Sequence, residues 1–201
     1  MIFNPAVRIK LHASSVLIAA LLVTGCDTEP PKPRRTAVSP RGYDPTSDVP
    51  DRYHFLYSGG IAYDQIESVW KSLPYTKIEL ERTECFGECP SYVVTYNADG
   101  TAEYNGRKYA MRPGVFHGEV GISDFGQICW MIDRFKILDG PRDYSANWTD
   151  SATDIIRITI RETNETIEIS DYGGQGPVEL WSLLNVMDAV SNRVEWAPGA
   201  E

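Results

Sequence analysis

Apolar and polar residues alternate in several short segments of the chain, which is typical of strands with one buried face. Ile156, Ile158 and Ile160 alternate with polar residues, so these isoleucines would face a core from a single strand. A second alternating run, residues 166–170, follows closely enough to pair with it. Residues 98–100 (Ala-Asp-Gly) predict a hairpin turn between two further strands. The other segments of strand character cover residues 77–83, 92–97, 101–105 and 115–120, and the turn at residues 98–100 joins the second of these to the third.

Three longer segments repeat apolar residues at helical spacing, which predicts helices with one buried face. Asp64 can cap the first, Ser123 is a favourable N-cap for the second, and Pro177 stands at a preferred first position of the third. The predicted helices cover residues 63–73, 123–135 and 177–192. Each carries one apolar stripe that would pack against a sheet.

The predicted elements follow the order helix, strands, helix, two strands, helix. Runs of strands separated by single helices are typical of the α+β class. Short turns between most strands favour antiparallel pairing. We therefore predict a single α+β domain over residues 52–201, in which a mainly antiparallel β-sheet has the helices packed on one face. About 150 residues are enough for one domain with a sizeable core.

The first 26 residues differ from the rest, with a positive start, an apolar run and a cysteine. Arg8 and Lys10 precede the unbroken apolar stretch 16–23, which is too short to span about 30 Å of hydrocarbon as a helix. Residues 22–26 (Leu-Val-Thr-Gly-Cys) resemble the lipobox of bacterial lipoproteins. The resemblance implies that residues 1–25 are a signal peptide and that Cys26 carries the lipid. A secretory signal without a lipid and a retained membrane helix are the alternatives.

Residues 26–51 form a proline-rich stretch with few apolar side chains. Six prolines fall between positions 30 and 50, so this stretch favours an extended, disordered chain. We predict a tether that lifts the domain from the membrane at about 3 Å per residue. Packing of this stretch on the domain is the alternative.

The chain is acidic, with 19 basic and 28 acidic residues and a formal net charge of −9. Two of the basic residues and none of the acidic ones lie in the predicted signal, so the remaining chain would carry −11. This charge opposes binding to nucleic acid and to anionic lipid. The lipid on Cys26 would therefore hold the protein at a membrane of the bacterial cell envelope, facing the periplasm or the exterior. Asp27 resembles an inner-membrane retention signal of enteric bacteria, but the choice of membrane stays open.

The most distinctive internal motif is Cys-Phe-Gly-Glu-Cys-Pro at residues 85–90. Three residues separate Cys85 from Cys89, and Gly87 permits the tight turn of a small disulfide loop. An exported protein enters an oxidising compartment, so we predict a disulfide between these two cysteines. Cys129 lies on a predicted apolar helix stripe, which favours a buried, inert thiol.

A copper or thiol-redox site is the alternative for the same motif. Cys-x-x-x-Cys-Pro resembles the copper-binding motif of the Sco-type copper chaperones, in which two thiolates and a distant histidine hold copper. Soft thiolates suit Cu(I), and His54 or His117 would be the third ligand beside Cys85 and Cys89. In those chaperones a helix follows the motif, whereas residues 92–96 here favour a strand.

The cysteine motif lies within a longer pattern that runs from Arg82 to Tyr92. Asp154 and residues 171–173 (Asp-Tyr-Gly) extend the pattern further along the chain. Together these residues resemble a bacterial family known as domain of unknown function 6438, over residues 77–196. The resemblance implies a secreted or lipid-anchored domain and lends no activity, because the family has none assigned.

No set of residues forms a recognisable catalytic constellation. The glycine-rich segment 171–177 lacks a P-loop lysine, so it predicts a turn into a helix. The acid-rich segment 139–154 does not have the spacing of a calcium loop. We therefore predict a non-enzymatic, lipid-anchored envelope domain, without a cofactor, that binds another protein or a ligand. A copper-binding or thiol-active protein is the alternative.

The substitution Cys26→Ser tests the predicted anchor. Only a thiol accepts the diacylglyceryl group, so the variant should lose acylation and accumulate as uncleaved precursor. Metabolic labelling with a fatty acid and partition into detergent would measure this against the unsubstituted chain. Processed, acylated protein from Cys26→Ser would show that the lipobox interpretation is wrong.

Overall fold

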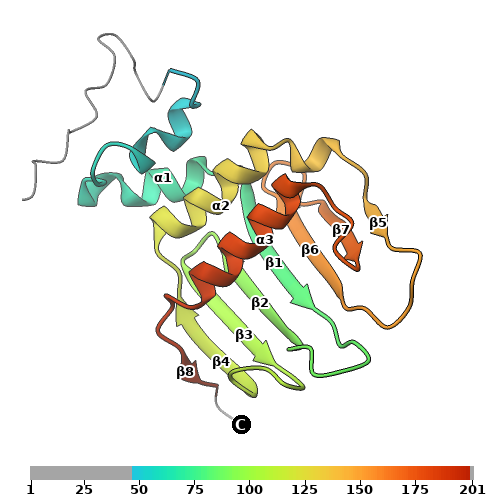
Figure 1. The fold of residues 1–201 in the computed structure, drawn as a ribbon. Helices are drawn as coiled ribbons and strands as arrows, with labels where there is room; N and C mark the ends of the chain where they lie inside the picture. The colour runs from blue at the N-terminus through green and yellow to red at the C-terminus, as the bar shows by residue number, and fades with distance from the viewer. Residues whose placement is uncertain (1–46, 200–201) are drawn as a thin grey trace, which may run out of the picture. The chain divides into compact units, whose positions relative to one another are not determined.

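The computed structural model describes residues 47–199, and the predictions for the signal, for Cys26 and for most of the tether lie outside these residues. The described chain forms one eight-stranded sheet with two long helices across one face (Figure 1). This arrangement confirms the predicted α+β class. None of the helices within the described range is long and apolar enough to cross a membrane.

The sheet has the strand order β5-β7-β6-β1-β2-β3-β4-β8. Every neighbouring pair is antiparallel except β5 and β7, which run parallel. The strands are β1 (Tyr75–Arg82), β2 (Tyr92–Asn97), β3 (Thr101–Gly106), β4 (Gly114–Glu119), β5 (Asp143–Ser145), β6 (Thr153–Ile160), β7 (Thr166–Tyr172) and β8 (Ala197–Pro198). The sequence pattern missed β5 and β8, because strands of three and two residues have no periodicity of their own.

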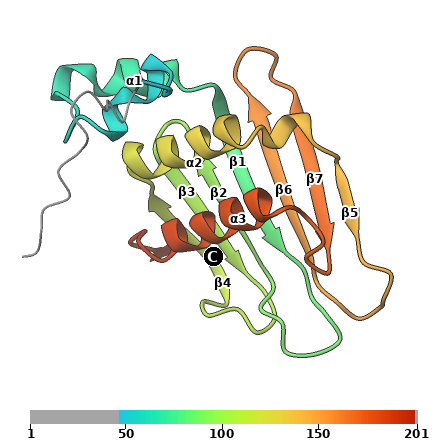
Figure 2. The ribbon, with the colours of Figure 1, turned by 45° about the horizontal axis from the view of Figure 1, so that its top comes forward.

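The helices gather on one side of the sheet. The longer ones are α1 (Ile66–Ser72), α2 (Ile122–Arg134) and α3 (Val178–Ser191), and the short 3-10 helices are η1 (Asp51–Leu56), η2 (Tyr63–Gln65) and η3 (Ile137–Asp139). Figures 1 and 2 show α2 and α3 across the same face of the sheet, as the sequence predicted.

Two predicted helix caps are wrong. Asp64 lies in η2 and makes no side-chain cap for α1, which begins beyond it. The helix α2 begins after Gly121, so Ser123 lies inside its first turn. The reason is tertiary, because the N–H of Val120 donates a hydrogen bond to the Gly100 carbonyl and fixes the chain at the end of β4. The helix then starts two residues beyond this fixed point, at Ile122.

The core lies between the inner face of the sheet and the two long helices. Ile78 and Leu80 of β1 and Ile158 of β6 are fully buried, as their alternation predicts. Tyr96 of β2 is also fully buried, and its hydroxyl donates a hydrogen bond of 2.7 Å to the Met187 carbonyl of α3. Other buried side chains from the sheet and helices are Val94, Phe125, Ile128, Cys129, Ile132, Ile156, Ile169, Leu180, Leu183 and Leu184.

A carboxylate of α2 joins η1 to the sheet. Tyr53 of η1 and Tyr75 of β1 donate hydrogen bonds of 2.6 and 2.5 Å to the two oxygens of Asp133. Burial, and then the bond to Asp133, raises the pKa of both phenols, so they stay protonated donors. Phe55 lies against Gly126, where a Cβ would overlap its ring. The segment η1 therefore packs on the domain as part of it.

The outer face of the sheet carries ion-paired side chains. Arg157 of β6 lies 2.7 Å from Glu79 and from Glu168, and 2.9 Å from Glu81. Burial alone would raise the pKa of Glu79 and Glu81, but the hydrogen bonds and charges of Arg157, together with those of Lys77 at Glu79 and of Arg107 at Glu81, outweigh it and lower both values. These pairs link β1, β6 and β7 side by side on the outer face.

The substitution Ile158→Asp should unfold the domain, because it places an unpaired carboxylate between sheet and helices. We expect a loss of about 4 kcal/mol or more in the free energy of unfolding, measured by urea and thermal denaturation. The control is Thr166→Asp, which adds the same charge at an exposed position of β7 and should melt close to the unsubstituted protein. Equal melting of both variants would contradict the inward orientation of Ile158.

Candidate functional site

Four loops meet at one end of the sheet, which we call the loop end. They are residues 83–91, 107–113, 146–152 and 173–177. The strands β1, β3, β5 and β7 all run toward this end, so the segments that follow them come together there (Figure 1). Segments far apart in the sequence therefore share one surface.

The inward row of side chains next to the loop end is polar, whereas the rows behind it are apolar. Arg82 lies two residues beyond Leu80 on β1, and side chains two apart on a strand face the same side. Its cross-strand neighbours are Tyr92 on β2 and Asp154 on β6, and Asp154 pairs in turn with Asp171 on β7. A charged row thus closes the core where the sheet meets its loops.

Arg82 is the centre of this row and joins the sheet to α3. Its Nη1 lies 2.5 Å from Asp154 Oδ2, and its Nη2 lies 2.6 Å from Asp188 Oδ2. The hydroxyl of Tyr92 donates a 2.5 Å hydrogen bond to Asp188 Oδ1, and Arg82 Nε donates a 3.3 Å bond to the same hydroxyl. The charged side chains are only 21–26% exposed. We call Arg82, Tyr92, Asp154 and Asp188 the Arg82 cluster.

The pKa shifts within the Arg82 cluster follow from burial and charge. Burial opposes the charge of Arg82, but the carboxylates of Asp188 and Asp154 outweigh it and raise the pKa of the guanidinium. Burial raises the pKa of Asp154, and Arg82 opposes this shift without cancelling it. Burial and the bond to Asp188 raise the pKa of the Tyr92 phenol. The cluster therefore combines a permanent cation, a protonated phenol and a carboxyl group whose pKa is raised.

Asp171 shapes the loop that leads into α3. The residue is 4% exposed, and its Oδ1 accepts hydrogen bonds from the N–H groups of Gln175 and Gly176 at 2.6 and 3.0 Å. Gly173 and Gly174 both adopt positive φ, which an L side chain would disfavour. The segment 171–177 is therefore a turn into a helix, as its sequence predicts.

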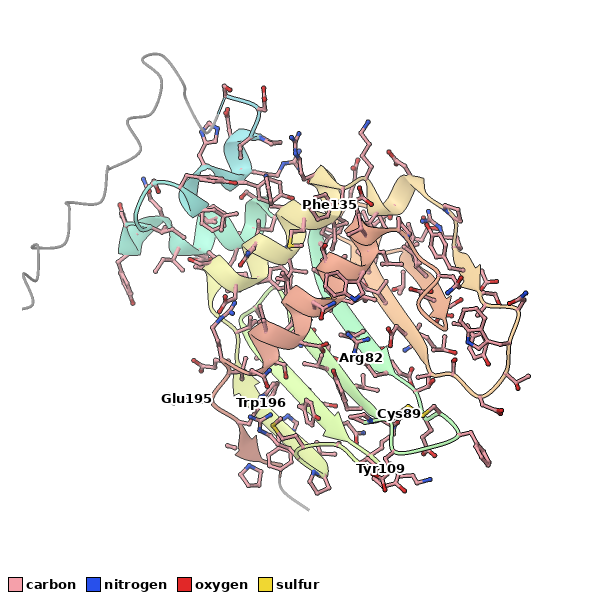
Figure 3. All side chains as sticks on the ribbon, viewed as in Figure 1. Arg82, Cys89, Tyr109, Phe135, Glu195 and Trp196 are labelled. Carbon is pink, nitrogen blue, oxygen red and sulfur yellow. A yellow bond between two sulfur atoms is a disulfide. The ribbon has the colours of Figure 1, made fainter. Side chains whose placement is uncertain are left out.

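The second feature of the loop end is the disulfide between Cys85 and Cys89, whose Cα atoms are 5.6 Å apart. The N–H of Gly87 donates a hydrogen bond of 2.9 Å to the Cys85 carbonyl within this small ring. The N–H of Phe86 donates a bond of 3.1 Å to the Asp150 carbonyl, which connects the ring to the loop 146–152. Figure 3 shows Cys89 and Arg82 near each other at this end of the sheet.

Large apolar side chains project from three of the four loops. Phe86 is 88% exposed, Met111 is 77% exposed, and Tyr109 and Trp148 are each 50% exposed. Two hollows lie beside them, of about 480 Å³ next to Arg82 and the disulfide and about 340 Å³ between Tyr109 and α3. Exposed aromatic side chains that gather on one surface are typical of a binding surface.

The structure brings together some of the candidate residues of the sequence and separates others. Cys85 and Cys89 are joined, and Cys129 is fully buried in α2, where burial raises the pKa of its thiol. His54 lies in η1 with its Nε2 2.8 Å from the Val49 carbonyl, and His117 lies on β4 near Glu103. Neither histidine is brought to the disulfide. Within residues 47–199, no three His, Cys, Asp or Glu side chains are grouped to hold a metal ion.

Sequence reasoning gave no role to Arg82, Asp154 or Asp188. A signal was present, because Arg82 follows Leu80 and Asp154 precedes Ile156 at inward positions of alternating strands. A charge at an apolar position of the pattern indicates a buried partner. The identity of that partner depended on α3, which follows in the chain after β7 and places Asp188 beside Arg82.

The substitution Arg82→Met should lower the free energy of unfolding by about 2 kcal/mol at neutral pH, because Asp154 and Asp188 lose their cation. Without Arg82 the pKa of Asp154 rises further, so its protonated form becomes favourable in the folded state. The loss should therefore be largest near neutral pH and should decrease as the pH falls and Asp154 takes up a proton. Urea unfolding across this pH range would measure it.

The control for this variant is Arg193→Met, which removes an arginine that is 51% exposed and paired with Asp124. An exposed pair is screened by water, so its loss should cost less than about 1 kcal/mol. Equal losses for the two variants, or a loss at position 82 that does not depend on pH, would contradict the role of the Arg82 cluster.

The comparisons with known proteins agree with the likeness in the sequence. A family model described as "Domain of unknown function (DUF6438)" matches residues 76–191. The matched range runs from β1 to the end of α3 and includes the Arg82 cluster and the disulfide. No curated protein matches the chain. Because the match covers more than half of the sequence, the chain belongs to the family described as a domain of unknown function, DUF6438.

Proposed function

We propose that this protein is a lipid-anchored binding domain of the bacterial cell envelope, which holds a protein partner at its loop end. The anchor is supported by the sequence of residues 1–26, with its positive start, short apolar run and lipobox-like cysteine. The binding role is supported by one observation, the exposed apolar side chains on loops that the Arg82 cluster and the disulfide hold in place.

Rigid loops favour this role for an energetic reason. A loop that must become ordered on binding loses conformational entropy, which weakens the complex. Here the loop 83–91 is closed by a disulfide and bonded to the Asp150 carbonyl, and the loop 173–177 is fixed by the carboxylate of Asp171. The exposed ring of Phe86 is thus presented by a backbone that is already ordered.

The loop end carries charges of both signs, which favours a partner of complementary mixed charge. Glu84, Glu88 and Asp150 are exposed around the disulfide, and the loop 107–113 carries three basic residues. One of these, Lys108, lies 3.7 Å from Glu84. Complementary charge steers association and adds specificity, while the aromatic side chains supply most of the affinity. The partner would accordingly combine an apolar patch with charged residues of both signs.

A photoreactive phenylalanine at position 86 tests the proposal in living cells. The crosslinker should join the protein to one discrete partner, because Phe86 projects from the loop end. The adduct should fall about tenfold when Trp148→Ser is added, since an aromatic hot spot contributes about 1.4 kcal/mol or more. Immunoblotting for the shifted species would measure both.

The matched control places the same photoreactive residue at position 63, because Tyr63 is 92% exposed but lies in η2. This variant should not give the same adduct. Equal amounts of the same adduct from positions 86 and 63 would contradict the loop end as the binding surface. So would an adduct whose amount does not change with Trp148→Ser, provided that this variant keeps its melting temperature.

A further inference from the structure

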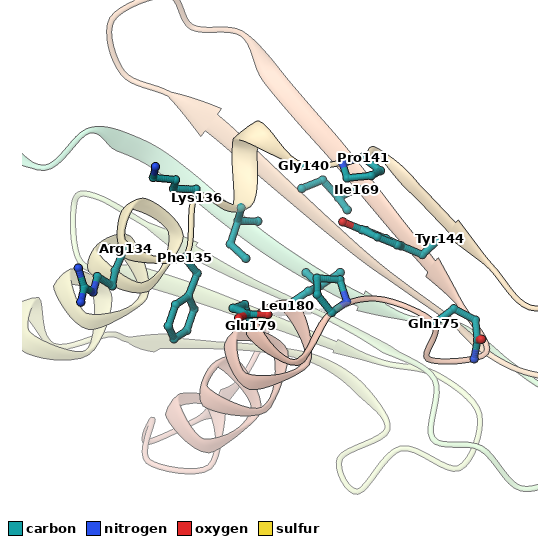
Figure 4. A pocket seen from close by; sticks show the side chains of 12 residues that line it. Arg134, Phe135, Lys136, Gly140, Pro141, Tyr144, Ile169, Gln175, Glu179 and Leu180 are labelled. Carbon is teal, nitrogen blue, oxygen red and sulfur yellow. The ribbon is translucent and has the colours of Figure 1, made fainter.

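A further cavity lies between the C-terminal end of α2 and the N-terminal end of α3, and of the loop-end residues Gln175 and Pro177 line it. Its volume is about 660 Å³, within the range of small-molecule sites. Most of its wall is apolar and comes from four different elements and their connections. The apolar side chains that line it include Phe135, Ile137, Tyr144, Ile169, Pro177 and Leu180 (Figure 4).

Two cations and one carboxylate border this cavity. Arg134 and Lys136 lie at the rim formed by the end of α2, where their side chains extend away from the apolar wall, and Glu179 belongs to α3 (Figure 4). Among the described residues, neither cation lies within 4 Å of a carboxylate oxygen. The segment 134–142 carries three basic residues and one acidic residue, in a chain whose net charge is −9. An anionic group would therefore be attracted to the α2 side of the cavity.

The backbone of Lys136 gives independent support. It follows Phe135, the C-cap of α2, and adopts a left-handed conformation with φ 52° and ψ 41°. Glycine is the usual residue at this position of a helix end, because a Cβ is unfavourable there. Lys136 is one of four non-glycine residues with positive φ among the described residues, and backbone of this kind clusters at ligand sites.

We propose that this cavity binds a small amphipathic organic anion. Its apolar body would lie against Tyr144, Ile169 and Leu180, and its carboxylate or sulfonate would pair with Arg134 and Lys136. The ligand class follows from the apolar wall and the two cations at its rim.

Titration of the purified full-length protein with 1-naphthoate tests the proposal. Calorimetry would measure the affinity, and NMR would locate the bound probe. The probe should bind, and its resonance shifts should centre on Tyr144 and Ile169. The neutral analogue 1-naphthalenemethanol and the cationic 1-naphthylmethylammonium should bind about tenfold more weakly, because they cannot pair with the two cations. No binding at millimolar probe, or equal binding of the three probes, would overturn the proposal.

The substitution Lys136→Gly separates binding from folding. Glycine adopts the left-handed backbone readily, so the melting temperature should stay equal or rise, while the dissociation constant for 1-naphthoate rises about tenfold. The matched control is Asn164→Gly, which changes another residue of positive φ, 57°, in the turn between β6 and β7. It should leave affinity unchanged, as should Phe86→Ala at the loop end. Unchanged affinity in Lys136→Gly would overturn the proposal.

Discussion

The ion pairs of Arg82 are the contact on which the loop end depends. One guanidinium joins Asp154 of β6 and Asp188 of α3, and Tyr92 of β2 completes the group. Arginine keeps its charge at all relevant pH values, so it can hold two half-buried carboxylates that would otherwise repel each other. The loops after β1 and β7 start next to this group. The first of these loops carries the disulfide and the exposed ring of Phe86.

Each of the two long helices has a carboxylate that accepts a hydrogen bond from a tyrosine hydroxyl of the sheet. The two carboxylates lie toward opposite ends of β1. Asp188 of α3 accepts a hydrogen bond from Tyr92 beside Arg82, and Asp133 of α2 accepts hydrogen bonds from Tyr53 and Tyr75. Between these carboxylates the contacts are mainly apolar and tolerate small shifts. A satisfied polar network has far stricter geometry than an apolar core, so it selects one arrangement of helix on sheet. The apolar core supplies most of the stability, and the two carboxylates fix the orientation.

The width of the sheet explains why the cavity between the ends of α2 and α3 exists. Eight strands spaced by about 4.8 Å span roughly 34 Å, whereas two packed helices cover about 20 Å. The helices therefore leave part of the inner face uncovered, and on the side of β5 and β7 the segment 135–141 closes it only partly (Figure 1). The wall there is apolar because Ile169 and Tyr144 belong to the same inward rows as the core. The loop-end surface and this cavity thus arise from different parts of one architecture.

The sequence by itself determined the fold class, six of the eight strands and the three longer helices, because the period of apolar side chains sets which face is buried. It also placed Cys129 and Ile158 in the core, and the spacing around Gly87 made the Cys85–Cys89 disulfide predictable. Only the tertiary structure decided the helix starts, the edge strands, the partners of Arg82 and the cavity beside Lys136. Each of these depends on segments far apart in the sequence, whose contacts no local pattern records.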